Sequence, residues 1–200
     1  MIIFIEGARA TGKTTLINKF LESCTDPRVE YYKFYFADHV KSLNLGRFDK
    51  SPALHYYSLG NIMTILELNQ RPAYKDKIWI FDRAIISAYV WAVLRDRLSI
   101  TEAKDECENL LSSDLFSNCS TVFINVNGEA RESGRTKDMW DMAHSTSSEQ
   151  GLMQMFNHFG KNDMDSVRRN NHFIEITNNW DESSVELFKK ACYHIIDGNK

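Results

Sequence analysis

Cysteine, proline and glycine are scarce in this chain of 200 residues, which has four cysteines, three prolines and nine glycines. The cysteines lie far apart, at Cys24, Cys107, Cys119 and Cys192, and form neither a C-x-x-C pair nor a dense disulfide framework. We therefore expect reduced, partly buried thiols and a cytoplasmic protein.

Long apolar runs, a strong net charge and several common catalytic motifs are also missing. No apolar run approaches the length of a membrane span, and the N-terminal run ends at Glu6, too early for a signal peptide. The net charge of −3 provides no global basic field for nucleic acid, although it allows a local basic groove. Neither the H-E-x-x-H zinc motif nor the G-x-S-x-G hydrolase elbow is present. With 43% hydrophobic and 26% charged residues, we expect one globular domain spanning residues 1–200.

A phosphate-binding motif stands near the N-terminus. Residues 7–14 have the sequence Gly-Ala-Arg-Ala-Thr-Gly-Lys-Thr and match the P-loop pattern G-x-x-x-x-G-K-[ST]. Residues 1–5 form an apolar run typical of a buried strand, and residues 15–21 show helical spacing, which is the context that a P-loop requires. The backbone N–H groups would surround a polyphosphate, the solvent-facing Lys13 would reach its terminal phosphates, and Thr14 would ligate Mg²⁺. The residues expected to bind the nucleotide are Gly7, Ala10, Thr11, Gly12, Lys13, Thr14 and Thr15.

Strands and helices alternate along the rest of the chain. Further strands are expected at 29–36, 78–81, 121–126 and 172–176, and helices at 51–69, 85–94, from 101 onward, at 150–159 and at 181–196. This order predicts an α/β protein with a parallel sheet, to which the first run and the four further ones contribute about five strands. Ligands then belong at the C-terminal ends of the strands.

Asp82 and Arg83 directly follow the expected strand 78–81. A carboxylate at this place can hold Mg²⁺ through water, or accept a proton from an attacking hydroxyl. The neighbouring arginine can bind an anionic acceptor. The alternative is that Asp82 only caps the following helix.

A polar segment at about 128–148 follows the fourth strand and contains Arg131 and Arg135. Phosphoryl transfer needs cations that close over the reacting group and exclude water, so we expect this segment to be the lid. The alternative is a solvated charged loop. Earlier in the chain, Tyr57 is an aromatic residue that could stack on a base or pack in the core, whereas the aromatic cluster from Tyr31 to Phe36 is expected to be mostly strand core.

Together these motifs resemble the thymidylate kinase family and its deoxynucleoside kinase relatives. The resemblance implies the three-layer P-loop NTPase fold, with a central parallel sheet of about five strands and a lid segment. It also implies an ATP- and Mg²⁺-dependent kinase that acts on a thymidine-like deoxynucleotide, as a monomer or a homodimer. It places Asp82 and Arg83 near the acceptor phosphate and the metal, and Tyr57 on the thymine ring.

Three positions depart from the family pattern. Arg9 replaces an acidic residue beside the sugar 3′-hydroxyl, and Asn61 replaces an arginine that contacts the thymine edge. The phosphate-binding arginine near the end of the second strand has no clear counterpart, and Arg47 is the candidate substitute. A cation suits an anion such as a 3′-phosphodiester, so an alternative acceptor is a hydroxymethyluracil base within DNA. Kinases of that kind occur in bacteriophages, which would place the protein in the host cytoplasm. An alternative from another class is a nucleotide-binding switch NTPase.

Overall fold

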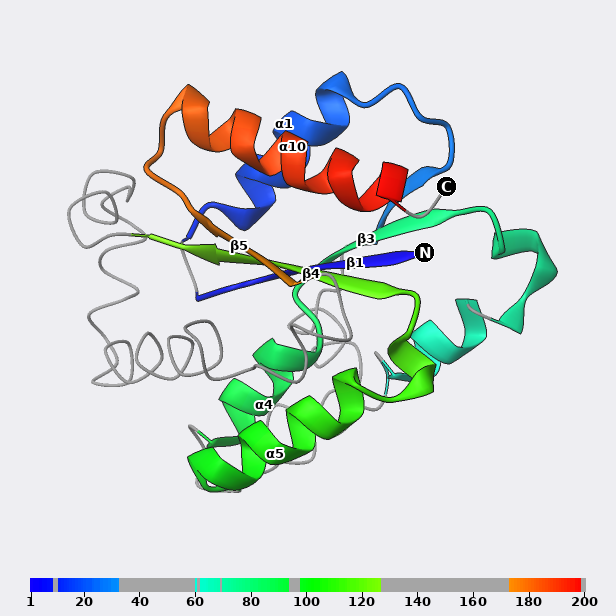
Figure 1. Cartoon of the computed structure of the whole chain (residues 1–200), viewed down its shortest axis with the longest axis vertical. Coiled ribbons are helices and arrows are strands. Elements are labelled where there is room, and N and C mark those ends of the chain that lie inside the picture. The colour runs from blue at the N-terminus through cyan, green and yellow to red at the C-terminus, as the bar shows by residue number, and fades with distance from the viewer. Residues whose placement is uncertain are drawn as a thin grey trace, which may run out of the picture.

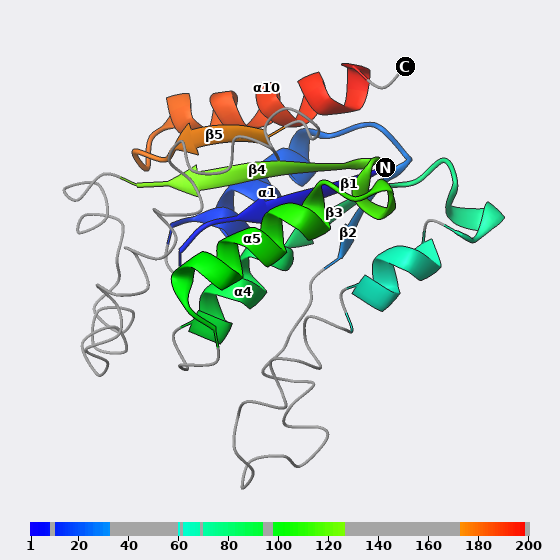
Figure 2. The same ribbon diagram turned by 60° about the horizontal axis from the view of Figure 1, so that its bottom comes forward.

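The computed structural model describes residues 1–8, 11–32, 60, 62–68, 70–93, 98–126 and 173–198. In this part of the chain, five parallel strands form one sheet in the order β2-β3-β1-β4-β5 (Figure 1; Figure 2). The strands are β1 (Ile2–Glu6), β2 (Val29–Tyr32), β3 (Ile78–Asp82), β4 (Cys119–Asn125) and β5 (Phe173–Thr177). The predicted parallel sheet is confirmed, and its central strand leads directly into the P-loop.

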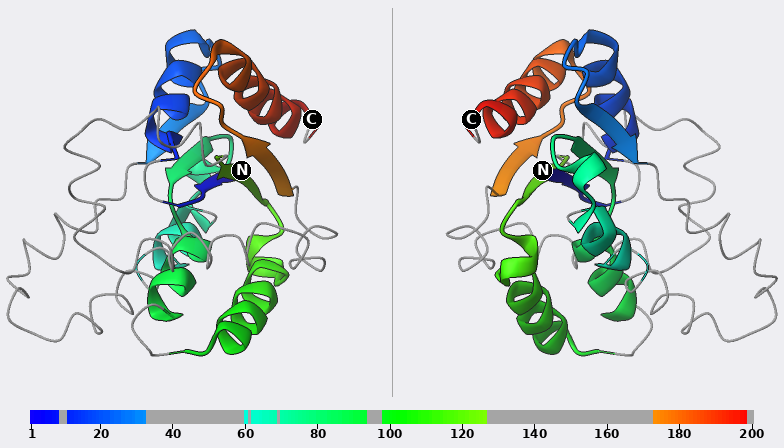
Figure 3. Two further views of the ribbon diagram at one scale, coloured as in Figure 1. Left: turned by 90° about the vertical axis from the view of Figure 1, so that its left-hand side faces the viewer. Right: turned by 90° about the vertical axis from the view of Figure 1, so that its right-hand side faces the viewer.

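Helices cover both faces of the sheet and produce three layers. The helices α1 (Lys13–Ser23) and α10 (Glu182–Gly198) lie on one face, and α4 (Ile85–Val93) and α5 (Ile100–Leu111) lie on the other (Figure 3). Two short 3₁₀ turns, η1 (Pro72–Tyr74) and η2 (Asp114–Phe116), precede β3 and β4. Because both faces are covered, the central strands β1, β3 and β4 consist mostly of apolar residues.

Alternation along the strands sends successive side chains to opposite layers. In β1, Ile3 and Ile5 pack in the core beneath α1 and α10, whereas Phe4 packs toward α4 and α5. In β3, Ile80 belongs to the α1 side. The period of two places Asp82, at the end of the same strand, on the side where α1 begins.

The observed boundaries refine the sequence prediction. Strand β4 begins at Cys119 rather than Thr121, because residues 119 and 120 pair with β1 although the second is polar. Helix α5 begins at Ile100, since Ser99 and Glu102 form a reciprocal capping box there. Residues 62–68 are helical, within the helix predicted for 51–69. The predicted end of the second strand, the lid at 128–148 and the helix at 150–159 lie outside the described residues.

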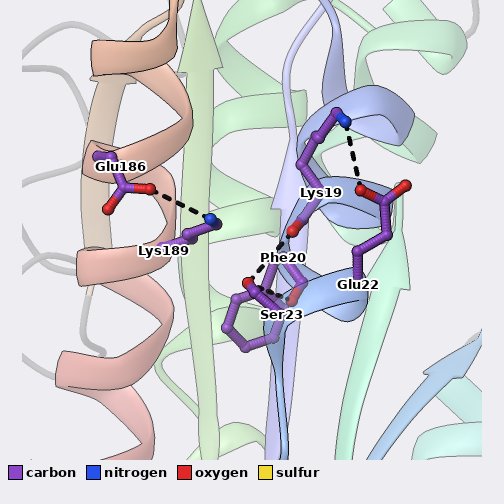
Figure 4. Close-up of polar contacts among 6 residues, drawn as sticks. All are labelled: Lys19, Phe20, Glu22, Ser23, Glu186 and Lys189. Carbon is purple, nitrogen blue, oxygen red and sulfur yellow. Dashed lines mark hydrogen bonds and ion pairs between the residues drawn. The ribbon is translucent and has the colours of Figure 1, made fainter.

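Helices α1 and α10 associate through buried aromatic residues, while their outer surfaces carry short-range polar pairs. The rings of Phe20 and Phe188 meet edge to face with centroids 6.3 Å apart. The surface pairs, drawn in Figure 4, are Lys19–Glu22 and Glu186–Lys189. Exposed pairs of this kind contribute little stability, so the buried contacts dominate the association.

All four cysteines are free, and Cys107, Cys119 and Cys192 are buried, as predicted. Burial raises the pKa of the Cys119 thiol to about 12, which keeps it protonated and unreactive at neutral pH. Among the described helices, none is both long and apolar enough to cross a membrane.

Candidate functional site

The P-loop turn requires glycine at both described glycine positions of the motif. Gly7 has a φ of 135°, and a Cβ atom added to it would lie 2.3 Å from the carbonyl oxygen of Ile124 in β4. Gly12 has a φ of 81°, and its Cβ would lie 2.4 Å from Nδ2 of Asn178. Residues with side chains rarely adopt these φ values, and both neighbours are held in place. The path of the backbone therefore explains the two glycines independently of any ligand.

Helix α1 begins directly after the loop and has no side-chain cap. Gly12 is its N-cap residue, and the first intrahelical bond runs from the Leu16 N–H to the Gly12 carbonyl. The N–H groups before Leu16 have no partner within the helix, and the helix dipole makes this end attractive to anions. Thr15 is exposed in the first turn, whereas the buried Thr11 donates its hydroxyl proton to the carbonyl of Ala8 at 3.0 Å.

Lys13 is buried rather than solvent-facing, so that sequence expectation is wrong. Its side chain is 4% exposed, and Nζ donates to the Ala8 carbonyl at 2.5 Å and to Thr11 Oγ1 at 3.1 Å. The lysine packs against the loop because the long methylene chain gains burial while the ammonium group keeps oxygen partners. Burial, with the nearby charge of Arg83, lowers the pKa of Lys13 well below its ordinary value, although neighbouring carboxylates oppose the shift.

Thr14 and Asp82 come together at the C-terminal edge of the sheet. The Thr14 hydroxyl donates to Oδ2 of Asp82 at 2.5 Å, and the Tyr31 hydroxyl donates to the same oxygen at 3.3 Å. Burial, followed by the charge of Asp82, raises the pKa of Tyr31. The carboxylate thus faces the start of α1, where an oxygen-binding cation could contact both Thr14 and Asp82.

Helix α4 is capped by Glu6. The alternative interpretation, in which Asp82 caps this helix, is therefore wrong. Oε1 of Glu6 accepts hydrogen bonds from the N–H groups of Ala84 and Ser87 at 2.9 and 3.3 Å. Its Oε2 accepts the Ser87 hydroxyl at 2.5 Å. Glu6 is 1% exposed, and burial raises the pKa of its carboxyl group despite these bonds. Asp82 is therefore left to face the P-loop.

Arg83 turns away from its neighbour Asp82 and contacts the start of the P-loop. Its φ is 74°, and its N–H continues the strand pairing by donating to the Ile5 carbonyl at 3.0 Å. Nη1 lies 3.3 Å from the Gly7 carbonyl and 3.5 Å from Ser87 Oγ. A positive φ is unfavourable for arginine, and such strain is often found at functional sites.

The loop after β5 supports the P-loop from the other side. Nδ2 of Asn178 donates to the Thr11 carbonyl at 2.9 Å, and its Oδ1 accepts the N–H of Trp180 at 2.9 Å. Trp180 has a φ of 62° and lies against Gly12, where a Cβ would be 3.0 Å from its ring. Asn178 is 3% exposed, so this support is shielded from water.

Several predicted site residues lie outside the described residues. This applies to the expected nucleotide-binding Ala10, the acceptor-binding Arg9, Arg47, Tyr57 and Asn61, and the lid residues Arg131 and Arg135. The described part brings together Gly7, Gly12, Lys13, Thr14, Asp82 and Arg83.

Sequence reasoning missed Glu6, Tyr31 and Asn178. A charged residue that ends a buried strand immediately before a P-loop was an available signal for Glu6. Tyr31 was grouped with core aromatics because periodicity gives no information about which neighbouring strand its hydroxyl meets. Asn178 is remote from the loop in sequence, and no local pattern marks it.

Comparison with solved structures finds this fold in thymidylate kinase from Candida albicans. The TM-score is 0.61, the match covers 99% of this chain and 91% of that chain, and the sequence identity is 15%. The chain matches no protein-family model, and no curated protein is similar to it in sequence. The chain therefore has the P-loop α/β fold of thymidylate kinase, a likeness of fold and not, at this identity, of activity.

Proposed function

We propose that the protein is an ATP- and Mg²⁺-dependent phosphotransferase of thymidylate kinase type, acting on a thymidine-like deoxynucleotide. The observation that carries the proposal is the contact of Thr14, at the start of α1, with Asp82, at the end of β3. A P-loop threonine beside a strand-end carboxylate is the arrangement that binds a metal–nucleotide complex.

The donor half of the site follows from the loop and helix α1. Lys13 and the N–H groups of the first turn of α1 would bind the donor phosphates. Thr14 Oγ1 and Asp82 Oδ2 lie 2.5 Å apart. Hydroxyl and carboxylate oxygens are the kind of ligand that suits Mg²⁺. When bound, Mg²⁺ neutralises phosphate charge that develops during transfer.

In the reaction, an acceptor oxygen forms a bond to the γ-phosphorus while the bond to the β-phosphate oxygen breaks, releasing ADP. A phosphate acceptor is already an anion, whereas a hydroxyl acceptor must lose a proton, which Asp82 would accept. Arg83 would bind the acceptor anion, after leaving its contact with the Gly7 carbonyl. The lid arginines Arg131 and Arg135 would close over the transferring group.

The acceptor half is proposed from the family resemblance, with Tyr57 stacking on the base and Asn61 and Arg47 binding its edge and phosphate. The thymidylate kinase of similar fold is described as having broad substrate specificity.

A second candidate acceptor is a hydroxymethyluracil base within DNA. Arg9, which stands where related kinases carry an acidic residue, favours it because a guanidinium suits a 3′-phosphodiester better than a free hydroxyl. Such a base would have to be flipped out of a duplex or presented in a single strand.

The test is transfer of labelled phosphate from ATP to thymidine, thymidylate and hydroxymethyluracil-containing DNA, with Lys13→Ala as the inactive control. Multiple turnovers onto thymidylate support the main proposal, and turnovers onto the oligonucleotide alone support the second candidate. Release of phosphate to water with no labelled acceptor would instead indicate a switch NTPase.

A further inference from the structure

We propose that Tyr31 is a positioning residue that orients the Asp82 carboxylate for metal binding, which rests on the proposed function of the Thr14–Asp82 site. The Tyr31 hydroxyl lies 3.3 Å from Oδ2 of Asp82, the oxygen that also accepts the Thr14 proton. Tyr31 would not contact substrate or metal, and would act only through Asp82.

The sheet explains how an edge strand reaches this site. Tyr31 of β2 pairs with Ile80 of β3, two residues before Asp82 on the same face. Its half-buried ring packs against the core beneath α1, which includes Ile80. The ring is therefore held by packing, and its hydroxyl is directed along the strand toward the carboxylate.

The chemistry requires a donor that adds no charge. A cation bound by Thr14 and Asp82 draws on the oxygen lone pairs of both residues. A carboxylate can rotate about its Cβ–Cγ bond, and a second donor to Oδ2 restricts that rotation. A phenol donates one proton without neutralising the carboxylate, whereas a lysine at this place would compete with the metal.

Tyr32 provides a matched control on the same strand. Its ring lies on the opposite face, with its centroid 4.7 Å from that of Phe81 and 6.5 Å from that of Trp79. Tyr32→Phe makes the same chemical change at the adjacent position without altering the Tyr31–Asp82 contact.

The experiment measures Mn²⁺ binding to the protein–ATP complex by electron paramagnetic resonance, together with the Mg²⁺ dependence of transfer. Tyr31→Phe should raise the Mn²⁺ dissociation constant and the Mg²⁺ concentration for half-maximal rate by about three- to tenfold, as expected for losing one hydrogen bond. ATP binding in the presence of a chelator, and kcat at saturating Mg²⁺, should stay close to those of the parent chain. Tyr32→Phe should leave the metal constants unchanged.

A double-mutant cycle separates positioning from a structural role. In an Asp82→Asn background, Tyr31→Phe should have no further effect on the Mn²⁺ constant, because its target is already altered. Equal metal constants for Tyr31→Phe and the parent chain would overturn the proposal, as would additive effects in the cycle. Loss of the cooperative unfolding transition in Tyr31→Phe would also overturn it, by assigning the hydroxyl to folding.

The parent chain separates this inference from the proposed function. If the parent chain binds no Mn²⁺ with ATP, both the proposed function and this inference are wrong. Metal binding without phosphoryl transfer would remove the kinase assignment but retain the role of Tyr31.

Discussion

The hydroxyl of Thr14 donates a 2.5 Å hydrogen bond to the carboxylate of Asp82, a residue 68 positions further along the chain. Strand β1, which leads into the P-loop before Thr14, and strand β3, which ends at Asp82, are neighbours in the sheet. The pairing of Ile5 with Asp82 brings the end of β3 beside the entrance to the P-loop. The candidate metal site is therefore a product of strand register.

Asp82→Asn should reduce the rate of phosphoryl transfer at least about a hundredfold, whether the carboxylate binds metal or accepts a proton. Transfer is measured as a function of Mg²⁺ concentration in both proteins. Recovery of the variant by raised Mg²⁺ alone would exclude the role as base.

Lys13→Ala should abolish measurable transfer, a loss of at least about a hundredfold, because no other described cation belongs to the loop that would hold the transferring phosphoryl group. The fold should survive, since the variant removes the hydrogen bonds to Ala8 and Thr11 but also the cost of burying the ammonium group. Turnover and thermal unfolding are measured on the same preparation. Near-normal turnover in a folded variant would remove the P-loop lysine from the mechanism.

Gly12→Ala should lower the free energy of unfolding by about 1–3 kcal/mol and weaken ATP binding, because alanine is strained at φ 81° and would collide with Asn178. Gly198→Ala is the control, since its added Cβ would meet nothing within 4 Å. That control should change stability by no more than about 0.5 kcal/mol. Equal stabilities for the two variants, measured by urea denaturation, would contradict the observed loop geometry.

Glu6→Gln should change how stability depends on pH. Burial raises the pKa of Glu6 in the folded chain above the ordinary value of 4.5, so the folded state holds its proton to higher pH than the unfolded chain. The free energy of unfolding of the parent chain should therefore fall, relative to that of the variant, as the pH rises from about 4.5 through the folded-state pKa. Urea denaturation of both proteins across this range tests the sign. An increase in the free energy of unfolding of the parent chain, relative to that of the variant, would contradict the prediction. It would mean that the hydrogen bonds from the helix amides and the charge of Arg83 outweigh the effect of burial on the pKa of Glu6.

Arg9→Ala should weaken binding of the acceptor more than binding of ATP. The loss of acceptor affinity should be about ten- to a hundredfold if the guanidinium binds a 3′-phosphodiester. Michaelis constants for ATP, a mononucleotide and an oligonucleotide are compared in this variant. A raised constant for ATP with unchanged acceptor constants would assign Arg9 to the donor site and remove the main support for a DNA acceptor.

The sequence by itself determined the fold class and the donor motif, because both depend on local information. Apolar runs such as Ile2–Ile5 mark buried strands, and the spacing of Gly7, Gly12 and Lys13 marks a phosphate loop wherever it occurs. Asp82 was also found locally, as a polar residue ending an apolar run.

Only the tertiary structure decided which side chains meet. Strand register and layer packing brought Tyr31 to Asp82 and gave Glu6, rather than Asp82, the N-terminus of α4. The same packing buried Lys13, which its charge alone had suggested would face solvent. Contacts between strands distant in sequence depend on sheet order, and local periodicity carries no information about that order.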